Sequence, residues 1–113
     1  MTTVTIYNDK TGNHKGFDVR GHAGYRSKGQ DIVCAAISTL LQGLINGLTE
    51  VVKIKPNYVI DEEIPHLSVT LPQELTPDIM EKCQILMRST YLSVKNVADG
   101  YQKFIKIKEK QHD

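Results

Sequence analysis

Two side chains that could perform nucleophilic catalysis stand twelve positions apart in this chain. His22 lies within Gly21-His22-Ala23-Gly24, and Cys34 follows Gly29-Gln30-Asp31. A cysteine can supply the nucleophile while a histidine accepts its proton, or keeps that proton as an imidazolium beside the thiolate. The residue types and their spacing therefore favour a Cys–His nucleophile pair.

The segments around this pair predict how the two side chains are positioned. Alternating polar and apolar residues predict strands over 3–7 and 16–20, so that His22 follows the end of a strand. Residues 23–30 form a predicted loop bounded by glycines, and Asp31 is a predicted N-cap for a helix from Ile32 to about Val51. Cys34 would then lie in the first helical turn, where unpaired N–H groups and the helix dipole lower a thiol's pKa.

The same placement predicts where a developing negative charge would be stabilised. The backbone N–H groups of Cys34 and Ala35 are the expected donors to the oxyanion of an acyl-transfer reaction. Asp31 would cap the helix or orient His22, with its carboxylate directed away from the sulfur.

The remaining pattern predicts a single two-layer domain over residues 1–113. Strands are expected over 58–60, 67–71 and 104–108, and a second helix begins at Thr76-Pro77-Asp78. The order β-β-α-β-β-α-β predicts an α+β fold, with a mainly antiparallel sheet and two helices. Gly43 and Gly47 are expected where the two helices cross closely. Each helix is also expected to have an apolar stripe that faces the core. The first stripe is Val33, Ile37, Leu40, Leu44, Leu48 and Val51; the second is Ile79, Cys83, Leu86, Thr90, Val94, Val97 and Tyr101.

Composition limits the classes of protein to which the chain can belong. The net charge is +1 over 113 residues, without a concentrated basic face, which argues against direct nucleic-acid binding. No apolar stretch is expected to span a membrane, and the N-terminus lacks the pattern of a signal peptide. We therefore expect a soluble cytoplasmic protein with two free thiols, without metal or cofactor.

Other interpretations of the same residues remain open at this stage. Cys34 could be a small buried residue on an apolar helix, His22 could form only structural hydrogen bonds, and Cys83 is expected in the core. A zinc site of His14, His22, Cys34 and His66 is a less favoured alternative. The loop residues Tyr25, Arg26 and Lys28 could be simply solvated, or could close over a bound peptide.

The motif as a whole resembles a known family. Gly21-His22-Ala23, followed by Gly29-x-Asp31-Ile32-x-Cys34-Ala35-Ala36 at the start of an apolar helix, closely resembles the ribosomal-processing cysteine proteases of bacteria, the Prp family. The resemblance covers essentially the whole chain. It implies an endopeptidase that removes the N-terminal extension of large ribosomal subunit protein twenty-seven after a Phe-rich segment. It also implies a homodimer that needs no cofactor.

The resemblance also implies roles for individual residues. Cys34 would be the nucleophile, His22 the general base and acid, and Asp31 a supporting residue. Contacts to the substrate peptide are expected from Gly21, Ala23, Gly24, Tyr25, Gly29, Ala35 and Ser38. Two other classes stay open: a non-catalytic peptide-binding factor in ribosome assembly, and a thiol-redox or metal-sensing protein that uses Cys34 with His22.

Overall fold

The computed structural model describes residues 1–21, 28–61 and 66–112. Its elements, in chain order, are β1 (Thr2–Asn8), β2 (His14–Arg20), α1 (Lys28–Asn46), the π-helical segment η1 (Gly47–Val52), β3 (Asn57–Asp61), β4 (His66–Thr70), α2 (Pro77–Gly100) and β5 (Ile105–Gln111). The predicted order of strands and helices is confirmed. The predicted start of α2 is confirmed as well, with Thr76 as N-cap and Pro77 in the first turn.

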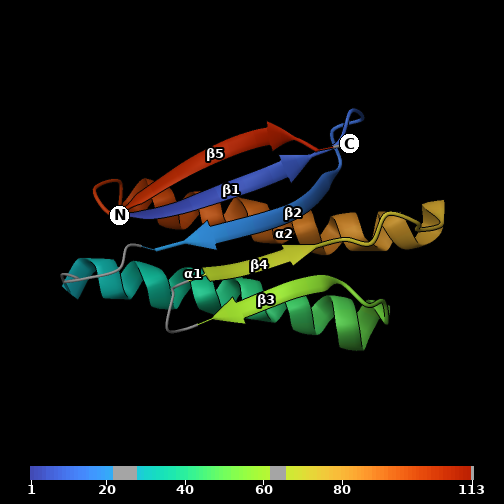
Figure 1. Ribbon diagram of the computed structural model, residues 1–113, viewed down its shortest axis with the longest axis horizontal. Coiled ribbons are helices and arrows are strands. Elements are labelled where there is room, and N and C mark those ends of the chain that lie inside the picture. The colour runs from blue at the N-terminus through green and yellow to red at the C-terminus, as the bar shows by residue number, and fades with distance from the viewer. Residues whose placement is uncertain (22–27, 62–65, 113) are drawn as a thin grey trace.

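The strands form one sheet in the spatial order β3-β4-β2-β1-β5. β1 pairs with β5 in parallel, and the pairs β1–β2, β2–β4 and β3–β4 are antiparallel. Both helices cover the same face of this sheet, as Figure 1 shows. The structure is therefore the two-layer, mainly antiparallel α+β fold that the sequence predicts.

The core lies between the sheet and the two helices. Val4 and Ile6 of β1 are fully buried, as are Val33 and Leu41 of α1. Side chains two residues apart on a strand share a face, so the β1 pattern buries one face against the helices. The first predicted helix stripe is correct at Val33, Ile37, Leu44 and Leu48. It is wrong at Val51, which is 75% exposed because the helix has changed to π geometry there and turned this position to solvent.

The two glycines that were expected at a helix crossing differ in role. A Cβ on Gly47 would lie 2.9 Å from Leu86 Cδ1 of α2, so the small residue lets the two helical segments approach closely. A Cβ on Gly43 would meet nothing within 4 Å. The close-packing prediction is therefore confirmed at Gly47 and wrong at Gly43, which lies on the open side of α1.

The first helical segment is more apolar than the sequence analysis allowed. Residues 29–52 are long and apolar enough to cross a membrane by length and composition alone, so the expectation that no stretch reaches this limit is wrong. In the fold, however, one face of this segment is buried against the sheet and α2. This buried face therefore contributes to the protein core.

A buried histidine joins β1, β2 and α2. His14 is 5% exposed, and its ring stacks on Tyr91 at a centroid distance of 4.6 Å. His14 Nδ1 lies 2.6 Å from Asn8 Oδ1, an oxygen that can only accept, so Nδ1 carries the proton. His14 Nε2 lies 3.4 Å from Arg88, which can only donate. The packed imidazole is therefore neutral.

This arrangement predicts that stability falls in mild acid. Burial lowers the pKa of His14 below 6.5, the neighbouring Arg88 lowers it further, and Glu109 opposes the shift. The unfolded chain therefore binds a proton more readily than the folded one, so stability is complete above about pH 6.5 and is lost as pH falls. Denaturant midpoints between pH 7.5 and 5 should show this loss. A His14→Gln variant should show a smaller slope, and an unchanged slope would contradict the assignment.

Candidate active site

Cys34 lies in the second turn of α1. The helix begins at Lys28, three residues before Asp31, so Asp31 is a first-turn residue and its assignment as N-cap is wrong. An acidic residue suits either position, because a carboxylate interacts favourably with the helix N-terminus in both. The Cys34 side chain is half-buried, on the flank of the apolar stripe, as the helical spacing predicts.

The earlier helix start changes which groups could stabilise an oxyanion. In an α-helix, each N–H donates to the carbonyl four residues earlier. The N–H groups of Cys34 and Ala35 are therefore directed to the carbonyls of Gln30 and Asp31. The expectation that these two N–H groups are open to a ligand is wrong for this structure, because they lie inside the helix and not in its first turn.

Two buried polar side chains contact the Cys34 sulfur. Thr2 Oγ1 of β1 lies 3.4 Å from Cys34 Sγ, and Gln30 Nε2 donates to the same sulfur over 3.6 Å. Gln30 Nε2 also donates to Thr2 Oγ1. Thr2 is 1% exposed and Gln30 is 5% exposed, so these contacts are shielded from water. We call Thr2, Gln30 and Cys34 the thiol cluster.

The position of the thiol cluster depends on a contact between α1 and the segment before β5. A Cβ on Gly29 would lie 2.6 Å from Cε2 and Cζ of the Phe104 ring, so the ring packs directly against the glycine backbone. The Phe104 carbonyl in turn accepts a hydrogen bond of 2.8 Å from the N–H of Thr2. Gly29 and Phe104 therefore hold the start of α1 and the start of β1 together. This packing role also explains a glycine inside the first helical turn.

Several predicted site residues lie outside the described part of the chain. These are His22, Ala23, Gly24 and Tyr25. Gly21 is described and directly follows β2.

The remaining predicted contacts lie on or near α1. Ala35 and Asp31 are exposed, and Ser38 is half-buried one turn beyond Cys34, where it accepts a hydrogen bond of 2.8 Å from Gln42. Gly29 is half-buried beneath Phe104. The structure therefore places Ala35 and Ser38 beside Cys34 along the helix, while Gly29 serves the packing at its start.

The other cysteine and the remaining histidines are held in separate environments. Cys83 is fully buried in α2, as predicted, and burial raises the pKa of its thiol while Lys15 partly opposes the rise. His66 Nε2 lies 2.7 Å from Asp18 Oδ1, and His14 is buried against α2. Within residues 1–21, 28–61 and 66–112, no group of three or more His, Cys, Asp and Glu side chains is arranged to hold a metal ion.

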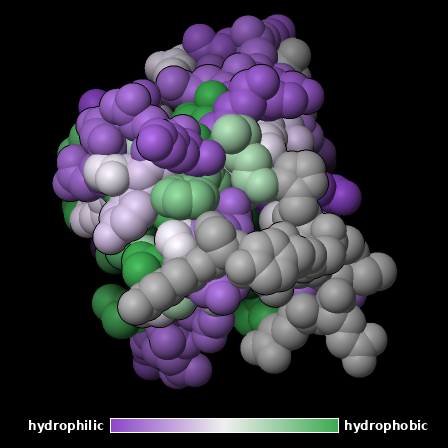
Figure 2. Space-filling model, turned by 90° about the vertical axis from the view of Figure 1, so that its left-hand side faces the viewer, coloured by the Kyte–Doolittle hydropathy of each residue, from purple (hydrophilic) through white to green (hydrophobic). Residues whose placement is uncertain are grey.

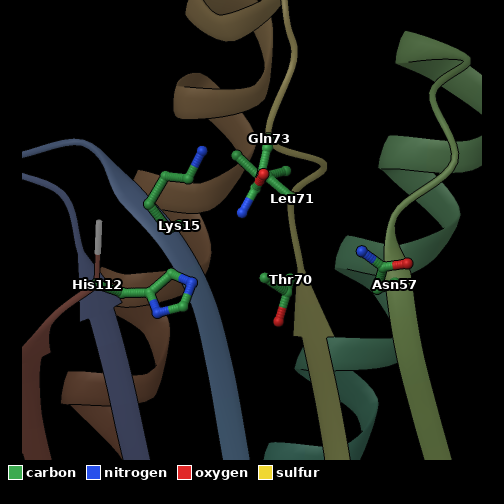
Figure 3. A pocket seen from close by; sticks show the side chains of 6 residues that line it. All are labelled: Lys15, Asn57, Thr70, Leu71, Gln73 and His112. Atoms are coloured by element: carbon green, nitrogen blue, oxygen red, sulfur yellow. The ribbon is translucent and has the colours of Figure 1, made fainter.

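Two grooves lie on the surface of the described residues. One, of about 460 Å³, is lined by Lys15, Asn57, Thr70, Leu71, Gln73 and His112. Figure 3 shows these side chains around the ends of neighbouring strands. This groove lies at the Asn8 end of β1, whereas Thr2 begins that strand, roughly 20 Å away at the rise of a β-strand. The second groove, also about 460 Å³, lies between α1 and α2, with Ala35, Ala36 and Leu40 on one side and Val97 on the other.

Thr2 and Gln30 were missed by the sequence analysis. Gln30 stands four residues before Cys34, which is the spacing that brings side chains together on a helix, but residues up to Gln30 were interpreted as a loop. Thr2 shares the inward face of β1 with Val4 and Ile6 by simple alternation. A helix start placed at Lys28 would have revealed Gln30.

Comparison with known proteins defines the family. The model of the family described as cysteine protease Prp matches residues 1–106. The ribosomal processing cysteine protease Prp of Mycoplasma pneumoniae is 30% identical over 104 residues, which are 91% of this chain and 95% of that protein. The protein of the same name from Bacillus subtilis is 24% identical over 107 residues, which are 95% of this chain and 96% of that protein.

Solved structures show the same fold. The essential ribosomal processing protease Prp from Staphylococcus aureus, in complex with a substrate peptide, aligns with a TM-score of 0.84 at 23% identity. The alignment covers 97% of this chain and 100% of that one. A second structure of that protein, in complex with a covalently linked product peptide, aligns with a TM-score of 0.80 at 24% identity and the same coverage.

The class of protein follows from the fold, the sequence matches and the half-buried Cys34 thiol on α1. The protein is a cysteine peptidase with an α+β fold. The chain belongs to the cysteine protease Prp family.

Proposed function

We propose that this chain is an endopeptidase of ribosome maturation. It removes the N-terminal extension of large ribosomal subunit protein twenty-seven, cutting after a Phe-rich segment and before small and basic residues. Cys34 is the nucleophile, His22 is the general base and acid, and Asp31 is a supporting residue. The observation that carries the proposal is the half-buried Cys34 thiol on α1, within a helix start whose sequence matches the family motif.

The names and complexes of the relatives support this substrate class. The relatives from M. pneumoniae and B. subtilis are named ribosomal processing cysteine proteases. The S. aureus relative binds a substrate peptide in one structure and a covalently linked product peptide in another. A covalent product is the species expected when a cysteine attacks a peptide carbonyl.

The proposed reaction is acyl transfer in two steps. His22 takes the proton of the Cys34 thiol, and the thiolate attacks the scissile carbonyl to form a tetrahedral intermediate. His22 then gives the proton to the leaving amine, the C–N bond breaks, and a thioester to Cys34 remains. Water, deprotonated by His22, attacks the thioester; the C–S bond breaks and the acid product leaves.

The surface at this end of the molecule suits a peptide of mixed character. Figure 2 faces the left-hand side of Figure 1, where α1 begins, and shows hydrophobic and hydrophilic side chains mixed over the described surface. We propose that Ala35 and Ser38, with Gly21, contact the peptide beside Cys34, and that residues 23–25 and Gly29 complete this surface. The protein is proposed to act in the cytoplasm as a homodimer, without direct nucleic-acid contact.

Mass spectrometry of a peptide that spans the extension and the mature N-terminus tests the proposal. The protein should cut it at one bond, directly after the Phe-rich segment. A matched peptide in which the Phe residues are replaced by Ser should stay intact. If the first peptide binds but is not cut, the alternative of a non-catalytic peptide-binding assembly factor replaces the protease proposal.

A further inference from the structure

We propose that Thr2 and Gln30 hold Cys34 as a thiolate, by donating two hydrogen bonds to its sulfur from the buried side of the site. This inference rests on the proposed function, in which the Cys34 thiolate is the nucleophile. It adds two residues to the reaction that the family motif around His22 and Cys34 does not include.

The directions of the hydrogen bonds support two donors to the sulfur. Gln30 Nε2, which can only donate, lies within hydrogen-bond distance of both Thr2 Oγ1 and Cys34 Sγ. Thr2 Oγ1 accepts from Gln30, so its own hydrogen is available for Cys34 Sγ, 3.4 Å away. When the thiol loses its proton, the sulfur can only accept, and the donor atoms Thr2 Oγ1 and Gln30 Nε2 already lie beside it.

Burial makes these donors effective. Thr2 and Gln30 are almost completely buried, while Cys34 is half-buried. Hydrogen bonds from neutral donors favour the charged form of an acceptor, and they are stronger where water is excluded. The inner side of the sulfur is thus stabilised by the protein, while the Cys34 residue as a whole keeps partial solvent exposure.

The cluster also compensates for the position of Cys34 in the helix. In the first turn, unpaired N–H groups would stabilise a thiolate directly. Cys34 lies in the second turn, where its own N–H belongs to the helix. Side-chain donors from Gln30, one turn earlier, and from Thr2 of β1 take over this role.

The test measures the thiolate itself. Alkylation of Cys34 by iodoacetamide is followed by mass spectrometry between pH 5 and 10, since the thiolate is the reacting form. Thr2→Val and Gln30→Met keep the side-chain size and remove the donor. Each should move the midpoint of Cys34 alkylation upward by about one pH unit, the size expected for one lost hydrogen bond to a charged group.

Controls separate this effect from a general disturbance of the fold. Thr2→Ser keeps the hydroxyl and should keep the midpoint, and Thr3→Val alters the next residue of β1, whose side chain lies on the opposite face. Cys83 in the same sample should stay unmodified in every folded variant, because it is fully buried.

The alkylation result does not depend on peptide cleavage, so the two proposals can fail separately. If Thr2→Val and Gln30→Met both fold and both keep the wild-type midpoint of Cys34 alkylation, the proposal that these residues stabilise the thiolate is overturned. If Thr2→Val does not fold, the Gln30→Met midpoint decides alone, with Thr2→Ser as its folded reference. If the variants shift the midpoint of Cys34 alkylation but the wild-type protein cuts no peptide, the role of Thr2 and Gln30 stands and the proposed protease activity is overturned.

Discussion

Cys34→Ala is expected to abolish cleavage of the extension peptide, with a loss of at least about 10⁴-fold in kcat, because it removes the thiol proposed to form the acyl-enzyme. The protein should remain folded, since the substitution removes only one half-buried sulfur. His22→Ala should cause a loss of similar order, because it removes the side chain proposed as the base. Cleavage is measured by mass spectrometry and folding by circular dichroism.

Cys83→Ala is the matched control for this prediction. Cys83 is fully buried, and burial raises the pKa of its thiol, so it cannot serve as a nucleophile at neutral pH. The variant should lose stability, because it leaves a small cavity, yet cut the peptide at the normal rate for each folded molecule. Undiminished cleavage by Cys34→Ala would refute the assignment of the nucleophile.

Most of the fold could be predicted because its signals are local. The alternation of polar and apolar residues predicts β1, and Thr76-Pro77-Asp78 predicts the start of α2. The parallel pairing of β1 with β5 joins residues about a hundred positions apart, and no local pattern encodes it. The π-helical η1 is a similar case, since Val51 continues the apolar stripe in sequence while the local geometry turns it to solvent.

The sequence motif predicts Cys34 and His22 as the site, but it does not predict the buried side chains that contact the Cys34 sulfur. The sequence predicts a helix start at Ile32, because glycines bound the preceding loop and the Asp31 carboxylate suits an N-cap. In the structure, the Phe104 ring occupies the space beside Gly29, and this contact between distant segments outweighs local preference. The error hid Gln30, so the thiol was assigned to the helix N-terminus and its side-chain partners were overlooked.

The stability of the core should be separable from the chemistry of the site. Leu41 lies on α1, two turns beyond Cys34, and is fully buried. Leu41→Ala is expected to lower the free energy of unfolding by about 2–5 kcal/mol, because the methyl groups lost leave a cavity that the core fills only in part. For a domain of this size, that corresponds to a fall of roughly 10 °C or more in Tm. Calorimetry measures the fall in Tm, and denaturant titration measures the loss in the free energy of unfolding.

Leu92→Ala makes the same chemical change on α2 at a side chain that is 49% exposed. Its cost should stay within about 1 kcal/mol, because much of the side chain is already in water. At 20 °C, both variants should retain the wild-type kcat/KM for each folded molecule, since neither residue contacts the thiol cluster. Equal losses of stability in the two variants would contradict the placement of the core between α1 and the sheet. A selective loss of kcat in folded Leu41→Ala would instead show that packing along α1 sets the position of Cys34.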